Sequence, residues 1–173
     1  MAARLFEDLP EPRLLREALG PGTAILNGFA SGTEAELVSA LRAVVERAPF
    51  RHMVTPGGFR MSVAMTNCGR LGWVTDRTGY RYDEIDSETG LQWPAMPPVF
   101  ARLAAGAARE AGFPLFLPDA CLITGMSQAR DCRSIRIKMN EISTSPSFRC
   151  LSDYRLFFSS AAWNVPIRRF EFR

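Results

Sequence analysis

Residues 49–69 read PFRHMVTPGGFRMSVAMTNCG, and this stretch decides most of what the sequence says about the fold. The letters MSVAMT at 61–66 then alternate apolar residues with small or polar ones, as a strand with one buried face does. The stretch therefore predicts a strand over residues 61–66 with one buried face.

Two amphipathic helices flank this stretch in the sequence. Thr33 and Glu36 have the spacing of a capping box, and the apolar face that follows ends before Pro49. A second apolar period begins at Pro98 and ends at Gly112. We expect a helix in each place.

Short apolar runs at 23–26 and 120–123 predict two further buried strands, so the expected class is α+β. The length of 173 residues suits a single domain with a substantial core.

The sequence contains no uninterrupted run of 18 apolar residues and no secretion signal at its start, so we expect a cytoplasmic protein that does not interact with membranes. Its four cysteines form no CxxC pair, which favours reduced thiols over disulfides or zinc.

The composition changes near residue 124. Residues 125–173 contain nine basic and four acidic residues, a net charge of +5, and hold only one of the 13 glycines. A basic excess is typical of proteins that bind nucleic acids or acidic surfaces. A flexible basic tail is the simplest interpretation, and we expect this part to be irregular because no clear helical or strand period runs through it before Arg155.

Several segments in the first 123 residues resemble a known family. Besides residues 49–69 they are Leu71-Gly72-Trp73, Gly79-Tyr80-Arg81-Tyr82, Trp93-Pro94-Ala95-Met96-Pro97 and Pro118-Asp119-Ala120-Cys121-Leu122-Ile123. In order and spacing they resemble the N-terminal half of the AlkB family, the iron(II)- and 2-oxoglutarate-dependent dioxygenases that remove alkyl groups from damaged nucleic-acid bases. The resemblance covers roughly residues 20–123. It implies a truncated relative of the double-stranded β-helix (jelly-roll) dioxygenase fold, with the lid and first elements present and most of the core barrel missing.

In that family this half forms a lid that grips the target nucleotide. The resemblance places Trp73 where the family stacks the alkylated base, and Tyr80 and Tyr82 where it contacts the nucleotide backbone, with Arg81 between them. A flipped base needs flat apolar surfaces to replace its lost stacking. Further positions around the substrate fall on Thr55, Gly57, Phe59 and Met65. The implied partner is alkylated single-stranded DNA or RNA, and no obligate protein partner is evident.

The residues that would hold the cofactors are absent. After Cys121-Leu122-Ile123 the family continues with Asn-Arg-Tyr, whose Asn and Tyr bind 2-oxoglutarate, and then with the His-x-Asp iron motif; this sequence has Thr124-Gly125-Met126 instead. Its single histidine, His52, lies where the family places no iron ligand, so we expect a structural or exposed histidine. We predict no catalytic residue, no metal ligand and no 2-oxoglutarate ligand in this chain, and no dealkylase activity from it.

The genetic code supplies a hypothesis for this departure. Asn-Arg-Tyr written AAC CGG TAT becomes ACC GGT ATG, or Thr-Gly-Met, when one A is lost and the next base is G. The same regrouping lets residues 131–137 encode Leu-Ser-Leu-His-Gln-Asp and residues 148–156 encode Ser-Val-Ser-Leu-Gly-Leu. We therefore hypothesise a single-base deletion that puts residues 124–173 out of frame.

The sequence thus divides into an N-terminal arm (1–19), an AlkB-like lid with flanking helices (20–123) and a non-family tail (124–173). The leading interpretation is a dealkylase-family member that has lost its iron and 2-oxoglutarate site. The first alternative is a non-enzymatic fragment that binds single-stranded nucleic acid weakly through Trp73 and Tyr80. The second is an interaction protein in which the basic tail itself binds the partner.

Overall fold

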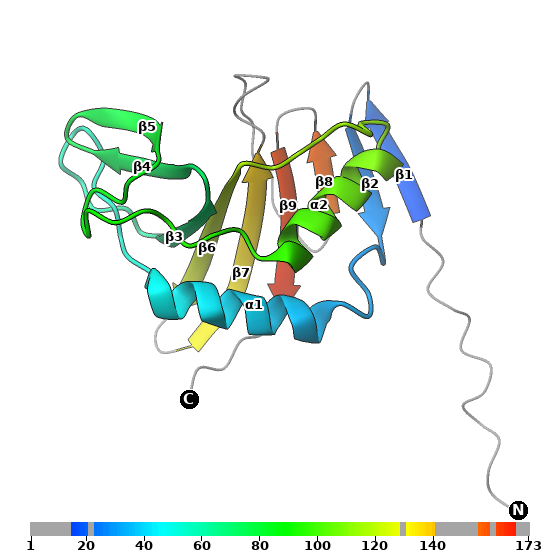
Figure 1. Cartoon of the computed structure of the whole chain (residues 1–173), viewed down its shortest axis with the longest axis horizontal. Coiled ribbons are helices and arrows are strands. Elements are labelled where there is room, and N and C mark those ends of the chain that lie inside the picture. Colours follow the sequence, from blue (N-terminus) through cyan, green and yellow to red (C-terminus); the bar gives the residue numbers. More distant parts are fainter. Residues whose placement is uncertain (1–14, 21–22, 129–130, 141–155, 160–161, 169–173) are drawn as a thin grey trace, which may run out of the picture.

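The computed structural model describes residues 15–20, 23–128, 131–140, 156–159 and 162–168 (Figure 1). In this part of the chain two helices, one large sheet and one separate hairpin form a mixed α+β fold, as the sequence predicts. Of the arm expected at 1–19, residues 1–14 lie outside the described residues, and the rest is not an arm, because Leu15–Gly20 form a strand of the large sheet. Among the described residues no helix is both long and apolar enough to cross a membrane.

The large sheet has seven strands in the order β1-β2-β8-β9-β7-β6-β3, and each neighbouring pair is antiparallel. Its strands are β1 (Leu15–Gly20), β2 (Thr23–Asn27), β3 (Ala64–Gly69), β6 (Ala120–Gln128), β7 (Asp131–Asn140), β8 (Leu156–Ser159) and β9 (Ala162–Arg168). The hairpin consists of β4 (Gly72–Asp76) and β5 (Gly79–Asp83), and it lies beyond β3 at one end of the large sheet (Figure 1).

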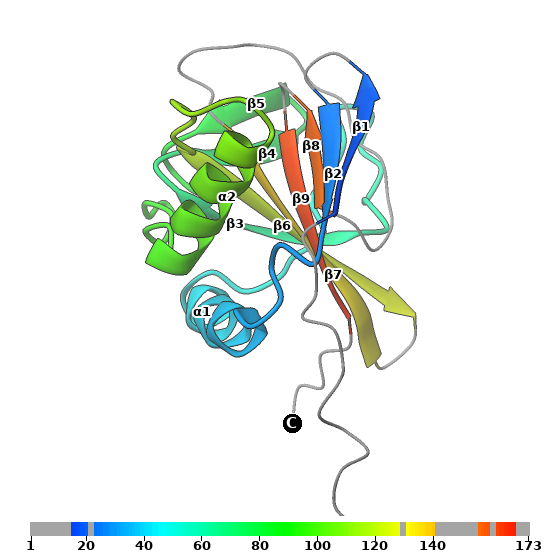
Figure 2. The same ribbon diagram turned by 90° about the vertical axis from the view of Figure 1, so that its right-hand side faces the viewer.

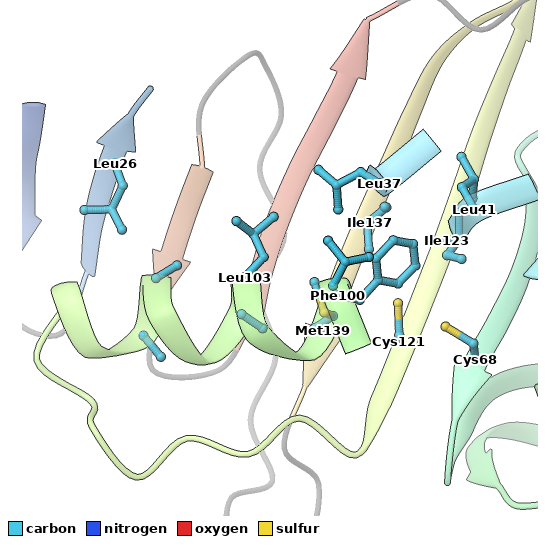
Figure 3. Close-up of a cluster of buried hydrophobic side chains, with 14 of the residues drawn as sticks. Leu26, Leu37, Leu41, Cys68, Phe100, Leu103, Cys121, Ile123, Ile137 and Met139 are labelled. Atoms are coloured by element: carbon cyan, nitrogen blue, oxygen red, sulfur yellow. The ribbon is translucent and has the colours of Figure 1, made fainter. Parts of the chain in front are cut away.

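Helices α1 (Glu34–Arg47) and α2 (Pro98–Glu110) cover the same face of the sheet (Figure 2). Their apolar faces meet the sheet in a cluster where Phe100 of α2 is fully buried, with Ile123 of β6 and Ile137 of β7 beside it (Figure 3). Cys68 and Cys121 face each other across β3 and β6 in this cluster, and both are free thiols. Burial raises the pKa of the Cys121 thiol well above its usual value, so its sulfur behaves as a small apolar group.

Both helices begin and end close to the predicted residues, but the capping box at the start of α1 is absent. Thr33 is the N-cap, yet its hydroxyl donates a 2.7 Å hydrogen bond back to the carbonyl of Ala30. Glu34 accepts a hydrogen bond from the Gly32 N–H, and Glu36 pairs with Arg102 of α2 at 2.7 Å. The acidic residues of this first turn are therefore divided between the preceding turn and the other helix.

Two strand predictions need correction. The strand expected at 61–66 is β3 at Ala64–Gly69, because Met61 is still bound to the preceding loop through its N–H and the carbonyl of Met53. The tail expected to be irregular continues as β6 and β7, and Ile137 and Met139 are fully buried against the helices. The alternation Ile135-Arg136-Ile137-Lys138-Met139 is a strand pattern that the sequence interpretation missed.

Candidate nucleotide-binding site

The β4–β5 hairpin carries its aromatic side chains on one face. Trp73 pairs with Tyr82 and Thr75 pairs with Tyr80, so these four side chains share one side of the hairpin. The Trp73 and Tyr80 rings stack with centroids 5.9 Å apart and an interplanar angle of 26°. Tyr80 is 60% exposed and Trp73 is half-buried. We call Trp73, Tyr80 and Tyr82 the aromatic face; it is a flat apolar surface already formed within the hairpin.

Arg81 lies on the opposite face of the hairpin from Trp73, because it pairs with Val74. Its guanidinium bonds Asp76 at 2.9 Å and Asp83 at 3.3 Å. The structure therefore brings Trp73 and the two tyrosines together and places Arg81 in an ion-pair group on the other side.

A loop over residues 53–61 holds three more of the predicted positions. The Thr55 N–H donates to the Phe59 carbonyl at 2.8 Å, and the Phe59 N–H donates to the Thr55 hydroxyl at 3.2 Å. Gly58 has a φ of +82°, which favours glycine at this turn. Gly57 is exposed, and the Phe59 side chain is 76% exposed. We call residues 53–61 the lid loop.

The lid loop is attached to the hairpin by a side-chain hydrogen bond. The hydroxyl of Thr75, on the same side of β4 as Trp73, donates to the Val54 carbonyl at 3.2 Å. Thr75 is only 5% exposed, so this bond is shielded from water. Val54, which precedes Thr55, is thus held against the side of the hairpin that carries the aromatic face.

Met65, the remaining predicted position, is buried. It is 3% exposed and belongs to a second buried cluster with Val74 and Trp93, against which Trp73 packs. The structure therefore covers Met65 from solvent, within the cluster against which Trp73 packs.

A buried ion pair under the hairpin is a feature that the sequence interpretation missed. Arg51 Nη1 lies 2.5 Å from Asp86 Oδ2, and its guanidinium carbon lies 5.1 Å from the centroid of the Trp93 ring. Asp86 is 4% exposed. Burial acts to raise the pKa of the Asp86 carboxyl, but the Arg51 guanidinium and the Glu88 N–H outweigh it and hold the pKa below its usual value. The pair fixes the start of the 49–69 stretch to the segment after β5.

A cavity of about 450 Å³ lies at Trp93, whose ring Arg51 contacts. It is lined in part by Arg70, Glu84, Trp93 and Asp119, and Arg70 bonds both Glu84 and Asp119 at 3.2 Å. None of the residues predicted to bind substrate lines it. The candidate site is therefore the aromatic face together with the lid loop. It is an exposed surface and not the cavity.

The β4–β5 hairpin has a local sequence pattern that predicts it. Trp73-Val74-Thr75 and Tyr80-Arg81-Tyr82 alternate on either side of Asp76-Arg77-Thr78-Gly79, which is a turn signal between two strand patterns. The turn is fixed by Asp76, whose carboxylate accepts hydrogen bonds from the Thr78 N–H at 2.8 Å and the Thr78 hydroxyl at 2.5 Å.

Comparison with known proteins identifies the family. Residues 22–131 match the family model of the 2OG-Fe(II) oxygenase superfamily. The chain is 53% identical over 108 residues to the alpha-ketoglutarate-dependent dioxygenase AlkB of Escherichia coli K12, an alignment that covers 62% of this chain and 50% of that protein. The AlkB homolog of Caulobacter vibrioides is 40% identical over 116 residues, which cover 67% of this chain and 50% of the homolog.

The fold agrees with this assignment. The solved structure of OsALKBH1 superposes with a TM-score of 0.59 at 14% sequence identity, over 91% of this chain and 88% of that one. The chain belongs to the 2OG-Fe(II) oxygenase superfamily. The predicted resemblance to AlkB is confirmed, and the chain spans about half the length of the curated relatives it matches.

The residues present do not fit the iron(II) that the family name implies. A facial iron site needs two imidazoles and a carboxylate, and the sequence contains one histidine. Nδ1 of that residue, His52, donates to the Met61 carbonyl at 2.8 Å, which ties it to the lid loop as a structural histidine. Among the residues that the structure describes, no group of three or more His, Cys, Asp or Glu side chains could hold a metal ion.

The hydrogen bonds in the turn of the β4–β5 hairpin predict a low pKa for the Asp76 carboxyl. The hydroxyl and N–H of Thr78, and then Arg81, lower the pKa of Asp76 from 3.8 to about 2. Because the folded pKa is below the unfolded one, the stabilisation is complete above about pH 4 and is lost as the pH falls through about 2. In an NMR titration of the side-chain carboxyl we expect a midpoint of about 2 for Asp76, and a higher midpoint in Thr78→Val. An Asp76 midpoint at 3.8 in the unsubstituted chain contradicts this account of the turn.

Proposed function

We propose that this chain is an AlkB-type superfamily member that retains a nucleotide-binding lid but lacks the iron and 2-oxoglutarate ligands, and so binds alkylated single-stranded DNA or RNA without dealkylating it. The observation that carries the proposal is the Trp73–Tyr80 stack, presented at the surface by a hairpin that lies within the segment matched by the family model. The curated relatives are alpha-ketoglutarate-dependent dioxygenases named AlkB or AlkB homolog. The similarity to AlkB supports nucleic acid as the partner of this chain.

The chemistry of the aromatic face suits a base taken out of its stack. Aromatic side chains replace base–base stacking and contribute about 1–3 kcal/mol per base. A base carrying an extra alkyl group stacks in the same way and adds apolar area to the contact. Thr55, Gly57 and Phe59 in the lid loop would border the base, since the Thr75–Val54 hydrogen bond holds this loop to the aromatic side of the hairpin. Arg81 would act indirectly, by holding Asp76 and Asp83 on the opposite face.

The proposed loss of catalysis rests on the donor set. One imidazole, already bound to the Met61 carbonyl, cannot replace two histidines and an aspartate. We accordingly interpret the chain as a truncated dioxygenase with the lid and first elements at 20–123. The last residues of the arm expected at 1–19 belong to β1, and the tail expected at 124–173 adds β7, β8 and β9 to the large sheet. The free thiols of Cys68 and Cys121 suit a reducing compartment, which supports a cytoplasmic location.

We attribute the missing ligands to a change of reading frame at codon 124. The codon regrouping that yields His-x-Asp supports this proposal. The pairing of β6 with β3 past residue 124 is compatible with it. β6 pairs with β3 as far as Gly125, but a ladder uses backbone groups that nearly every residue supplies. An out-of-frame segment that happens to alternate, as 135–139 does, can therefore extend the sheet.

The frame proposal predicts the nucleotide sequence. Restoring one base near codon 124 should open a continuous frame that encodes Asn-Arg-Tyr, a His-x-Asp motif, a later histidine and two arginines. Sequencing the coding region in both directions tests it, with codons 20–123 as the internal control that must stay unchanged. Stop codons throughout the restored frame rule out the hypothesis.

Substitution of Trp73 tests the binding proposal. We expect Trp73→Ala to weaken binding of a labelled single-stranded oligonucleotide with one methylated adenine by about tenfold, the loss of one stacking partner. Trp73→Phe should retain most of the affinity, and Leu115→Ala, on an exposed loop, should leave it unchanged. Fluorescence anisotropy with and without a chelator measures the affinity and its independence of iron.

Two results would count against the proposal. Binding that is unaffected by Trp73→Ala but falls steeply with salt would favour the alternative in which basic residues of the tail bind the partner. Stoichiometric aldehyde release from the methylated oligonucleotide would show that the chain retains an iron site.

A further inference from the structure

Asn67 makes an unusual pair of hydrogen bonds. It lies on β3, is fully buried, and its side-chain amide reaches across to the neighbouring strand β4. Its Nδ2 donates to the Trp73 carbonyl at 3.0 Å, and its Oδ1 accepts from the Trp73 N–H at 3.0 Å. One amide side chain thus satisfies both backbone polar groups of the residue that carries the central ring of the aromatic face.

The two Asn67 hydrogen bonds take the place of those that a third strand would make on the outer edge of β4. In an antiparallel pair the N–H and C=O of one residue point to the same side of the strand. Since those of Trp73 point to Asn67, they point away from β5, and Trp73–Tyr82 is a non-hydrogen-bonded pair with its side chains close together. The Asn67 amide acts as one rung of a β-ladder on the outer edge of β4. Without it, two backbone groups beside a buried cluster would lose their partners.

Asn67 is itself held rigidly. β3 pairs with β6 from Ala64 to Gly69, and Asn67 lies opposite Leu122 in this ladder. The residues on either side of it point to the helix face: Cys68 enters the main core, and the Thr66 hydroxyl donates to the Ala48 carbonyl at 2.7 Å. The backbone of Asn67 therefore cannot rotate or slide without breaking contacts on both faces of the sheet.

We propose that Asn67 is a positioning residue for nucleotide binding: by holding both backbone groups of Trp73 it sets the direction in which the indole ring leaves β4 and keeps that ring stacked on Tyr80. This inference rests on the proposed function, and it adds a residue that does not touch the nucleotide. Side-chain direction in a strand follows the backbone, because Cβ leaves each residue at a fixed angle to its N–H and C=O. A strand released from Asn67 could turn about its axis and tilt the ring away from Tyr80.

The test compares two buried substitutions on neighbouring residues. Asn67→Leu removes the amide at similar volume, and Thr66→Val removes a buried hydrogen bond that does not involve Trp73. Both should lower the melting temperature of the full chain. Only Asn67→Leu should change the near-ultraviolet circular dichroism that arises from the Trp73–Tyr80 stack, with no ligand present. It should also weaken binding of the methylated single-stranded oligonucleotide by about tenfold, whereas Thr66→Val stays within about twofold.

Asn67→Asp is the second variant, and it remains informative if Asn67→Leu does not fold. A protonated aspartic acid has the shape of asparagine and can both donate to the Trp73 carbonyl and accept from its N–H, whereas the carboxylate can only accept. Burial favours the protonated form. Relative to the unsubstituted chain at each pH, Asn67→Asp should bind the oligonucleotide normally at about pH 5 and more weakly at about pH 8.

The outcomes separate this inference from the proposed function. If Trp73→Ala does not weaken oligonucleotide binding, the proposed function is wrong. If Trp73→Ala weakens binding but Asn67→Leu behaves like Thr66→Val in both the dichroism and the affinity, or Asn67→Asp shows the pH dependence of the unsubstituted chain, the positioning role of Asn67 is overturned while the proposed function stands.

Discussion

Strand β3 is the constraint on which the rest of the structure depends, because both of its faces are buried. Thr66 and Cys68 face the helices, where one caps the end of α1 and the other fills the main core. Met65 and Asn67 face the other way, where one supports the Trp73 cluster and the other binds the Trp73 backbone. A one-residue slip in the pairing with β6 would exchange these two sets and place a polar amide in the apolar core. The register of a single strand therefore determines both the core and the aromatic face.

The ion pairs contribute unequally to this arrangement. Arg102–Glu36 joins the two helices with side chains 64% and 55% exposed, and such pairs are worth about 0–1 kcal/mol. Arg51–Asp86 is different, because the two side chains are only 16% and 6% exposed. Removing one partner of a buried pair costs about 3–5 kcal/mol, since it leaves the other charge without a partner. The connection between the 49–69 stretch and the segment after β5 thus depends on charge, whereas the helices depend on apolar packing.

The sequence predicts those parts of the fold that have local signals. Pro49 and Pro98 mark a helix end and a helix start, and the resemblance to AlkB leads directly to the aromatic face. What it does not predict depends on partners distant in sequence. Asn67 has no local pattern that distinguishes it from a surface asparagine, and Asp86 becomes a buried charge only because Arg51, 35 residues earlier, lies beside it. The strand at 131–140 was missed for a different reason, since its alternation is short and the basic residues obscured it.

The aromatic face is held to β3 through Asn67 and requires no iron centre. Hydrogen exchange of the Trp73 amide tests this directly, because that N–H has Asn67 Oδ1 as its hydrogen-bond acceptor. The account predicts slow exchange in the purified chain with a chelator present, comparable to that of the β3 amides paired with β6 and unchanged by added iron(II) and 2-oxoglutarate. Exchange of the Trp73 amide at the rate of an unstructured peptide, or protection that appears only when both cofactors are added, would contradict it.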